Sequence, residues 1–521
     1  MKKFYFAIIA FFLTCSISFG QMSGDSESLV PADVSIFVKS KEISKLTKTM
    51  NYIVNNLMDE KQRGEFIAKR DEFKKNTGID YLDEKSLRSA GVDTDRSVSL
   101  ANFEKDISDD VNLLLIPVLN EDEAVLRFME VIRRINPDDS AELKNVTTRY
   151  KNQTVYELKD KMYVTCVNKY IIVGSTSDII KKAIDLKDSR NNTLILDENY
   201  KDFVSRIGDG YDLNVFLTKR FFVNRFSKGN DEGSLLDSID YIAAGIGLDK
   251  NKIQINASAK FAKDNQSAKE YLNFLKTGVH ASSIYIPTAD STMFFSLDYQ
   301  YINKFCKGEV EWCEQYHSLK ELVKRETGID FDKDLLPYFN GGINIISQDS
   351  TSSFGGFGDA LVFVPMTNPA KIETLWNNMK KFFQAKYSKS KKFGEEKIGS
   401  NKSFWFIDEN QMRFFVSYDK RGIYAGNSTV LMKSGLAANT VTQSKSSRYK
   451  DIINDKTFYI LNIKKSSFLN MFIQMGAQAQ GNSNVAGLVN RLGEIFLYSE
   501  KNDNFISLNL EIEIKEAKSK K

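Results

Sequence analysis

The chain of 521 residues contains two histidines, His280 and His317, which are the first candidates for catalysis. A serine or cysteine hydrolase needs a base beside its nucleophile, and histidine usually supplies it. The Gly-x-Ser-x-Gly segment that forms the nucleophile elbow of many hydrolases occurs nowhere in the sequence. We therefore interpret both histidines as exposed or structural, and the sequence predicts no catalytic residue.

Cys306 and Cys313 are separated by six residues and allow two interpretations. An oxidising compartment would permit a disulfide, and Gly308 would let the intervening chain bend to close it. In one regular helix the two cysteines would lie two turns apart, too far for a bridge. The sequence therefore does not decide between a disulfide and two free thiols. Zinc binding is not expected, because these cysteines and His317 lack a standard spacing and a fourth ligand. Cys166 lies in a strand-like segment and should be a small buried side chain.

Two other segments imitate binding motifs. Residues 330–334 (Asp-Phe-Asp-Lys-Asp) resemble the start of a calcium loop, but Leu335 and Gly341 occupy the positions where an EF-hand needs glycine and glutamate. A helix N-terminus explains these carboxylates better. The glycine-rich segment 354–359 precedes a strand, whereas a dinucleotide-binding loop follows one. The sequence thus predicts no metal site and no cofactor site.

Two short segments recur at an offset of about 250 residues. Thr-Gly-Ile-Asp occupies residues 77–80 and 327–330, and Tyr-Lys-Asp occupies residues 200–202 and 449–451. One such match is weak, but the common offset indicates two copies of one domain in tandem.

The elements expected around these segments also occur twice. Each copy begins with a strand after a proline, continues through a helical region that stops at Gly78 or Gly328, and then forms two strands. Asn120 or Asn368 should cap the next helix, since an asparagine side chain accepts a bond from a first-turn amide. A three-strand meander, a short helix, a strand, an aromatic helix, a last helix and a last strand follow. The expected ranges are strands 97–101, 111–116, 342–346 and 360–364, helices 121–135 and 369–383, and last strands 253–261 and 505–514.

The helices 121–135 and 369–383 each carry an apolar stripe that should face a sheet. Their apolar residues recur at i, i+3, i+4 and i+7, as Val125, Phe128, Met129 and Ile132, and as Ile372, Leu375, Trp376 and Met379. Short loops between neighbouring strands predict antiparallel pairing. The predicted fold class is α+β, with two tandem copies of a mainly antiparallel sheet covered by helices. The expected segments are a signal peptide (1–20), copy 1 (29–262), a helical connector (263–282), copy 2 (283–514) and a basic tail (515–521).

The first twenty residues are typical of a secretory signal. Lys2 and Lys3 precede a short apolar run, and Ser18 and Gly20 place small side chains before the expected cleavage site. Lipidation at Cys15 is a less favoured alternative, because Thr14 fits a lipobox poorly. Removing the signal lowers the net charge from +4 to +2, which argues against nucleic-acid binding. No second long apolar run occurs, so we expect no transmembrane helix after cleavage.

The chain resembles uncharacterised bacterial exported proteins with a duplicated domain of unknown function. The resemblance rests on Pro31–Asp33, the Thr-Gly-Ile-Asp segments, Tyr170–Gly174 and Tyr200–Phe203. The signal ending before Gln21 and the frequent Lys and Asn are similar to exported proteins of Bacteroidetes-like bacteria. The resemblance implies a Gram-negative envelope setting, which is periplasmic, outer-membrane associated or secreted.

The function expected from the sequence is a non-enzymatic cell-envelope protein. It would bind a small ligand or an envelope protein through a cleft or joint between its two copies. The alternatives are a carboxylate-based hydrolase, whose paired acids are invisible in sequence, and a structural or assembly factor that uses sheet edges at the outer membrane. Two convergent, partly buried carboxylates in a pocket would favour the hydrolase.

Overall fold

The computed structural model describes residues 26–58, 60–103, 111–135, 146–158, 162–189, 191–208, 210–226, 238–249, 251–278, 283–306, 311–348, 359–387, 389, 392–409, 411–439, 454–464 and 492–515. Several predictions fall outside these residues: the signal peptide with Cys15, His280, most of the glycine-rich segment 354–359, the second Tyr-Lys-Asp segment and most of the basic tail. The described chain is a mixed α+β protein, as predicted.

The chain divides into two compact units. Unit 1 comprises residues 1–268, 490–492 and 511–521, and unit 2 comprises residues 269–489 and 493–510. Helix α9 (Gln266–Phe274) lies in the segment expected to be a helical connector.

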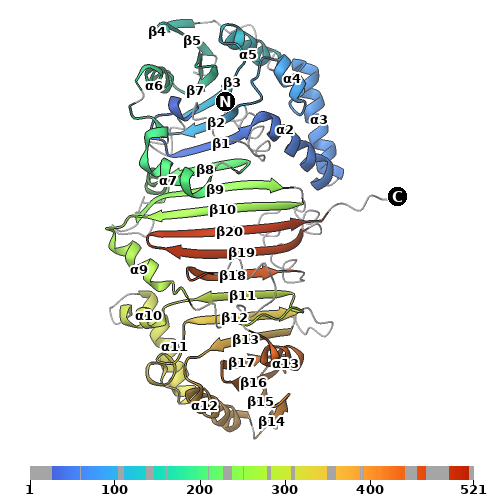
Figure 1. Cartoon of the computed structure of the whole chain (residues 1–521), viewed down its shortest axis with the longest axis vertical. Helices are drawn as coiled ribbons and strands as arrows, with labels where there is room; N and C mark the ends of the chain where they lie inside the picture. Colours follow the sequence, from blue (N-terminus) through green and yellow to red (C-terminus); the bar gives the residue numbers. More distant parts are fainter. Residues whose placement is uncertain are drawn as a thin grey trace. The chain divides into compact units, whose positions relative to one another are not determined.

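The sheet of unit 1 consists of antiparallel neighbours (Figure 1). Its order is β4 (Val146–Tyr150), β5 (Gln153–Leu158), β6 (Met162–Val167), β7 (Tyr170–Gly174), β3 (Asn112–Pro117), β2 (Ser97–Asn102), β1 (Ile36–Glu42), β8 (Leu213–Thr218), β9 (Ile239–Asp249) and β10 (Lys252–Phe261).

When the strands are counted along each copy, the strand order in the unit 2 sheet is the same as in the unit 1 sheet. In this order the strands are β14 (Phe393–Ile398), β15 (Asn401–Ile407), β16 (Arg413–Asp419), β17 (Gly422–Gly426), β13 (Asp359–Pro365), β12 (Gly342–Gln348), β11 (Ser291–Ser296), β18 (Thr457–Ile463), β19 (Leu492–Asn502) and β20 (Phe505–Ile514). Leu492 of β19 and residues 511–514 of β20 belong to unit 1.

The helix stops and caps predicted from the sequence are confirmed. Gly78 and Gly328 have φ angles of +78° and +69°, a conformation that glycine adopts without steric cost at a helix end. The Asn120 side chain accepts a bond from Asp122 N (3.0 Å), and the Asn368 side chain accepts one from Ala370 N (3.1 Å). The helices that follow are α5 (Glu121–Ile135) and α12 (Pro369–Tyr387).

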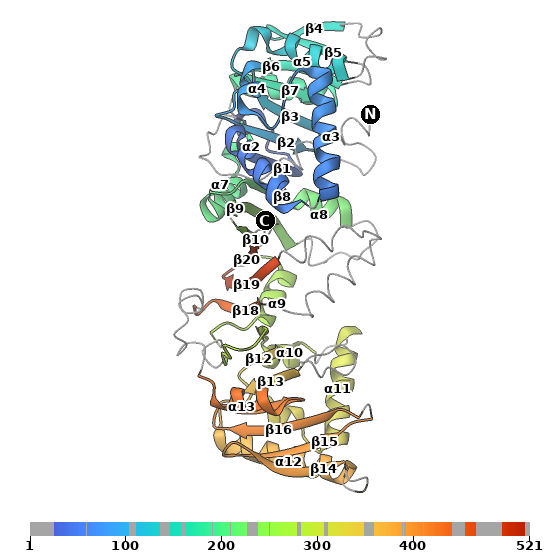
Figure 2. The same ribbon diagram turned by 90° about the vertical axis from the view of Figure 1, so that its right-hand side faces the viewer.

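Helices cover both faces of the unit 1 sheet. One face meets α2 (Ile43–Tyr52) and α5, which lie near α3 (Glu60–Thr77) and α4 (Glu84–Ser89); Figure 2 shows these helices on the side of unit 1 that faces the viewer. The other face meets α6 (Ser177–Asp188), because a methyl group at Gly174 would lie 2.9 Å from Ile179 and Ile180. Helices α7 (Glu198–Ile207) and α8 (Lys219–Phe226) pack on β8 to β10.

Two hydrophobic clusters show that unit 2 is covered on both faces as well. Helix α12 packs on Phe404, Val416 and Ile423, whereas α13 (Thr429–Ala437) packs on Phe363 and Tyr424. Adjacent residues of a strand point to opposite faces, which places the two helices on opposite sides of β17. The remaining helices are α10 (Tyr299–Phe305), α11 (Glu311–Thr327) and the one-turn η8 (Phe331–Leu335).

The last helix predicted in each copy is wrong, because β9 and β19 precede the last strands. Residues 243–247 of β9 read Ala-Ala-Gly-Ile-Gly and carry little β-propensity of their own. Tertiary contact explains the glycine at 245: a Cβ there would lie 2.3 Å from the Tyr211 ring. Strands β4 and β14 were also not predicted.

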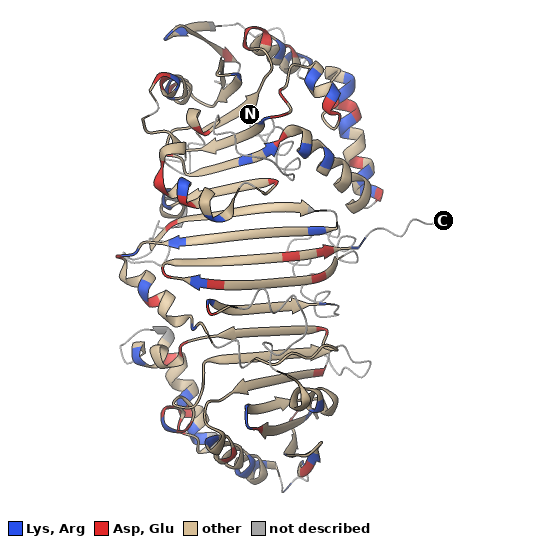
Figure 3. Ribbon diagram, viewed as in Figure 1, with Lys and Arg blue, Asp and Glu red and all other residues tan. Residues whose placement is uncertain are grey.

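Charged residues lie mainly on the helices of each unit and near strand ends, as Figure 3 shows for α3, α5, α11 and α12. This distribution follows from burial of the sheet faces under helices, since charged side chains are rarely buried without a partner. Among the described residues, no helix is long and apolar enough to cross a membrane.

Candidate functional site

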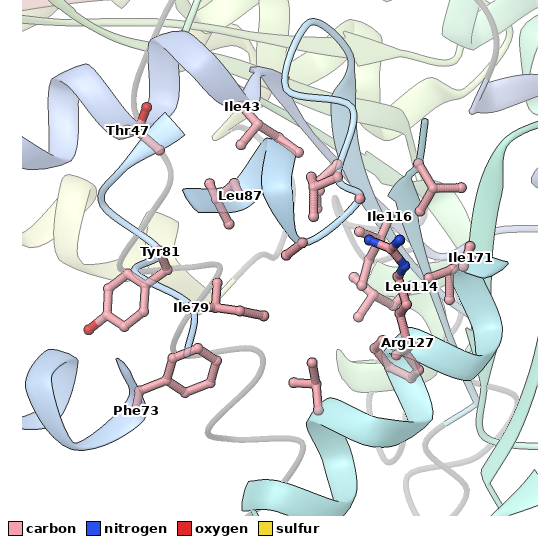
Figure 4. A pocket seen from close by; sticks show the side chains of 18 of the residues that line it. Ile43, Thr47, Phe73, Ile79, Tyr81, Leu87, Leu114, Ile116, Arg127 and Ile171 are labelled. Carbon is pink, nitrogen blue, oxygen red and sulfur yellow. The ribbon is translucent and has the colours of Figure 1, made fainter. Parts of the chain in front are cut away.

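Unit 1 contains a cavity of about 290 Å³ between one face of its sheet and helices α2 to α5. Figure 4 shows side chains converging from these elements, with Phe73, Ile79 and Tyr81 on one side and Leu114, Ile116 and Arg127 on the other. Its size is near the lower end for small-molecule sites, which are typically concave and mostly apolar.

The floor of the cavity comes from three neighbouring strands. Val98 of β2, Leu114 and Ile116 of β3, and Ile171 of β7 all line it. Leu114 and Ile116 are two residues apart, so both point to the same face of the sheet. The strand pattern therefore supplies a continuous aliphatic surface.

Helix α5 forms one wall. The apolar residues that line the cavity from this helix recur at helical spacing and lie on one side: Ala124, Phe128, Val131, Ile132 and Ile135. Val125 and Met129 are buried in the neighbouring core cluster with β6 and β7. The apolar face of α5 is thus wider than the sheet alone requires, and its extra width borders the cavity.

Helix α2 forms another wall through Ile43, Leu46 and Met50, spaced at i, i+3 and i+7. The Thr47 side chain also lines the cavity, and its hydroxyl donates to the carbonyl oxygen of Ser44 at 2.9 Å. This local bond satisfies the hydroxyl within the helix. The wall therefore presents mostly hydrocarbon to the interior.

The first Thr-Gly-Ile-Asp segment forms the turn that brings α3 to the cavity. Gly78 ends the helix, Ile79 lines the cavity, and the Thr77 hydroxyl donates to the Phe73 carbonyl at 2.7 Å. The next residues, Tyr81 and Leu82, also line it. The repeated motif therefore shapes the site through its backbone and its isoleucine.

A buried carboxylate fixes this turn. Asp80 accepts hydrogen bonds from Arg70 Nε and Leu82 N, at 2.8 and 3.1 Å, and lies 3.2 Å from Lys74 Nζ. The hydrogen bond from Arg70 is the main cause that lowers the pKa of Asp80 to about 2, against the opposing effect of burial. The ionised carboxylate thus holds Ile79 and Tyr81 in place at neutral pH.

Arg127 is the charged residue among the described residues that line the cavity. Its Nη2 and Nε donate to Glu123 Oε2 at 2.7 and 3.1 Å, and its Nη1 donates to the Ser89 carbonyl at 3.4 Å. Half of the side chain is exposed, so the guanidinium lies at the boundary between cavity and solvent. The arrangement suits binding of an apolar molecule and supplies one cation at the edge.

The residues singled out in the sequence lie elsewhere. Cys306 and Cys313 of unit 2 form a disulfide, with Cα atoms 5.2 Å apart. Cys306 follows the end of α10 and Cys313 lies in the first turn of α11, so the two cysteines do not share one helix. His317 Nε2 is hydrogen-bonded to the Cys306 carbonyl. No group of three or more potential metal-ligating side chains occurs within the described ranges.

The other two sequence candidates have structural roles. Cys166 is buried in β6, and this burial raises the pKa of its thiol to about 12. Asp330 caps η8 by accepting bonds from Asp332 N and Lys333 N, and it also pairs with Lys324 at 3.2 Å. The helix-terminus explanation for these carboxylates is therefore confirmed for Asp330.

The sequence reasoning missed the cavity and a buried polar network in unit 1. Lys39 Nζ lies 2.6 Å from Glu27 Oε1, with both side chains at most 4% exposed. The Tyr200 hydroxyl donates to the same carboxylate oxygen at 3.0 Å. The wide apolar face of α5 was a usable signal for a broad buried surface on this helix, whereas nothing in the sequence paired Glu27 with Lys39.

Comparisons with solved structures find weak similarity. Crystal form IV of TP0453 has a TM-score of 0.26 and 10% sequence identity, and covers 45% of this chain and 79% of that chain. Crystal form I has a TM-score of 0.24 and 9% identity, and covers 45% of this chain and 77% of that chain. These TM-scores are too low to inform fold or function. No curated protein matches the sequence.

A family model matches residues 63–402, which include most of unit 1 and part of unit 2. The matched range contains α5, both Thr-Gly-Ile-Asp segments and the cavity-lining residues from Phe73 to Ile171. The chain belongs to this family, described as proteins of unknown function (DUF3352).

Proposed function

We propose that this protein is an exported cell-envelope protein that binds an apolar small molecule in the cavity of unit 1. The observation that carries the proposal is the lining, where α2, α5 and three strands contribute aliphatic and aromatic side chains. Burial of hydrocarbon in such a space is favourable by about 25 cal/mol per Å². The signal-like N-terminus supports export, and the shared strand order supports descent of both units from one duplicated domain.

The proposed site differs in place from the joint that the sequence suggested. All of its lining residues belong to unit 1, and the joint remains a prediction. No aspartate or glutamate is among the described lining residues, so this cavity does not supply the carboxylate pair by which we would recognise the alternative hydrolase. Binding without catalysis is the function that its side chains support best.

Filling the cavity tests the proposal. Val131→Trp places a large ring on the cavity side of α5, and binding of the neutral fluorescent probe N-phenyl-1-naphthylamine should weaken at least about tenfold because the space is occupied. Leu126→Trp is the matched control, since Leu126 lies on the same helix, is 61% exposed and does not line this cavity. This control should bind the probe as the natural protein does.

A second cavity-filling variant keeps the test possible if Val131→Trp does not fold. Ala90→Phe enters the cavity from the end of α4, where φ is −76° and a side chain is tolerated. Circular dichroism and thermal unfolding establish which variants remain folded. The proposal fails if the natural protein binds no apolar probe, or if both folded filling variants retain full binding.

A further inference from the structure

The structure also bears on which class of apolar molecule the cavity takes, and this step rests on the proposed function. The Arg127 stem lies along the cavity edge, because a methyl group at Gly91 would stand 3.7 Å from Arg127 Cδ, an ordinary van der Waals contact. Both residues line the cavity. The hydrocarbon part of Arg127 thus continues the apolar wall while its guanidinium reaches solvent.

The guanidinium retains hydrogen-bonding capacity beyond its protein contacts. Arginine has five N–H donors. Glu123 and the Ser89 carbonyl use three of them in the described part of the chain. One N–H on each terminal nitrogen therefore remains for an anion, and arginine binds carboxylate and phosphate groups through such donor pairs.

We infer that the ligand is a single-chain amphiphile with an anionic head group, such as a fatty acid or a monoalkyl phosphate. The tail occupies the apolar cavity, and the head binds Arg127 at its edge. This orientation leaves the ligand charge near water, which avoids the large cost of burying an ion in an apolar interior. A neutral amphiphile of the same length would gain the tail contacts alone.

The test compares two amphiphiles that differ in the head group. Dodecanoate and dodecanol compete against N-phenyl-1-naphthylamine on the natural protein at low ionic strength, where an exposed ion pair is least screened. We expect dodecanoate to bind about tenfold more tightly, as befits charge-assisted hydrogen bonds. Arg127→Gln should remove this preference, which is read as the ratio of the two affinities because the Arg127 stem contacts the tail of either amphiphile. Dodecyl phosphate in a third arm distinguishes a carboxylate-specific site from one that accepts either anion.

Arg134→Gln is a closely matched control on the same helix. Arg134 pairs with Glu130 as Arg127 pairs with Glu123, both at i,i+4, and both arginine side chains are 50% exposed. Arg134 does not line the cavity; its Nη1 donates to the Thr77 carbonyl instead. Its substitution should preserve the preference for dodecanoate.

The opposite change is expected at Glu123. Glu123→Gln removes the carboxylate that competes for the guanidinium and should tighten dodecanoate binding severalfold.

Equal binding of dodecanoate and dodecanol to the natural protein would overturn the inference while the proposed function stands. Equal loss of preference in the Arg127 and Arg134 variants would also overturn it. Failure of every apolar probe to bind would instead refute the proposed function.

Discussion

The sheets of unit 1 and unit 2 have the same order of strands, but side chains fill one face of each sheet differently. These faces lie under α5 in unit 1 and under α12 in unit 2. Under α5, mostly aliphatic side chains together with Phe73, Tyr81 and Phe128 surround a cavity. Under α12, rings pack against one another in what we call the aromatic cluster: Trp376, Phe383, Phe404, Phe406 and Tyr418. The ring centroids of Phe383 and Phe406 are 4.1 Å apart, and those of Trp376 and Phe404 are 5.6 Å apart.

The repeated Thr-Gly-Ile-Asp segment makes the contrast direct. Ile79 lines the cavity in unit 1, whereas Ile329 is buried in the same hydrophobic cluster as Trp376 in unit 2. The turn is alike in both units, since each glycine has a positive φ. What differs is the set of surrounding side chains, which leave a cavity in unit 1 and pack against one another in unit 2.

The largest expected effect comes from opening the aromatic cluster. Trp376→Ala should destabilise unit 2 by about 3–5 kcal/mol, because the buried indole leaves a void and its hydrogen bond to the Val416 carbonyl is lost. Phe128→Ala in unit 1 should cost about 1–2 kcal/mol, because Phe128 already borders a cavity and has fewer contacts to lose.

Urea unfolding measures both effects. The three tryptophans, Trp312, Trp376 and Trp405, belong to unit 2, so their fluorescence reports on that unit. Leu126→Trp adds a reporter to unit 1 at an exposed site. Equal losses for Trp376→Ala and Phe128→Ala would contradict the distinction between a filled and an open face.

The disulfide provides the next test, because it belongs to unit 2 alone. Replacing Cys306 and Cys313 together by serine should lower the stability of unit 2 by about 2–3 kcal/mol, the value expected for a short closed loop. Tryptophan fluorescence in urea measures this loss, and Cys166→Ala serves as a control in unit 1. An unchanged unit 2 midpoint in the double variant would show that the bridge does not stabilise the unit.

A smaller effect is expected from acid. The pKa of Asp80 is lower in the folded protein than in the unfolded chain, so its stabilisation is complete above about pH 4 and is lost as the pH falls towards 2. Asp80→Asn should therefore cost unit 1 about 2 kcal/mol at pH 7 and flatten the dependence on pH below 4.

Asp330→Asn in unit 2 is the matched comparison. Asp330 is more exposed than Asp80, and its partner Lys324 is 56% exposed, so solvent screens the pair. Its substitution should change stability less. Urea midpoints measured from pH 2 to pH 7, with the Leu126→Trp reporter for unit 1, check both variants. A larger effect at Asp330 would reverse the proposed difference between the two turns.

Local signals in the sequence predicted much of the scaffold. The bounds of α5 and β6 follow from the asparagine cap, the 3.6-residue apolar period and the short turns. These features act within a few residues of chain, which is why they can be read without the fold. Strands β9 and β19 escaped prediction because their conformation depends on pairing with strands on either side.

The cavity escaped prediction for a different reason. Its lining comes from residues 43 to 171, and its volume is the space that remains after all those side chains have packed. The apolar stripe of α5 predicted a buried face, but it contained no information about the distance to α2 and α4.

By itself, the sequence determined the α+β class, the recurrence of the turn segments, and the caps and stripes of α5 and α12. It determined these because each depends on backbone conformation or on periodicity along one element. Only the tertiary structure decided that Lys39 meets Glu27 in the interior, that Arg127 lies at the edge of a cavity, and that unit 2 holds aromatic rings where unit 1 holds open space. Those outcomes depend on contacts between residues far apart in the chain, where the balance of packing, charge and remaining volume is set.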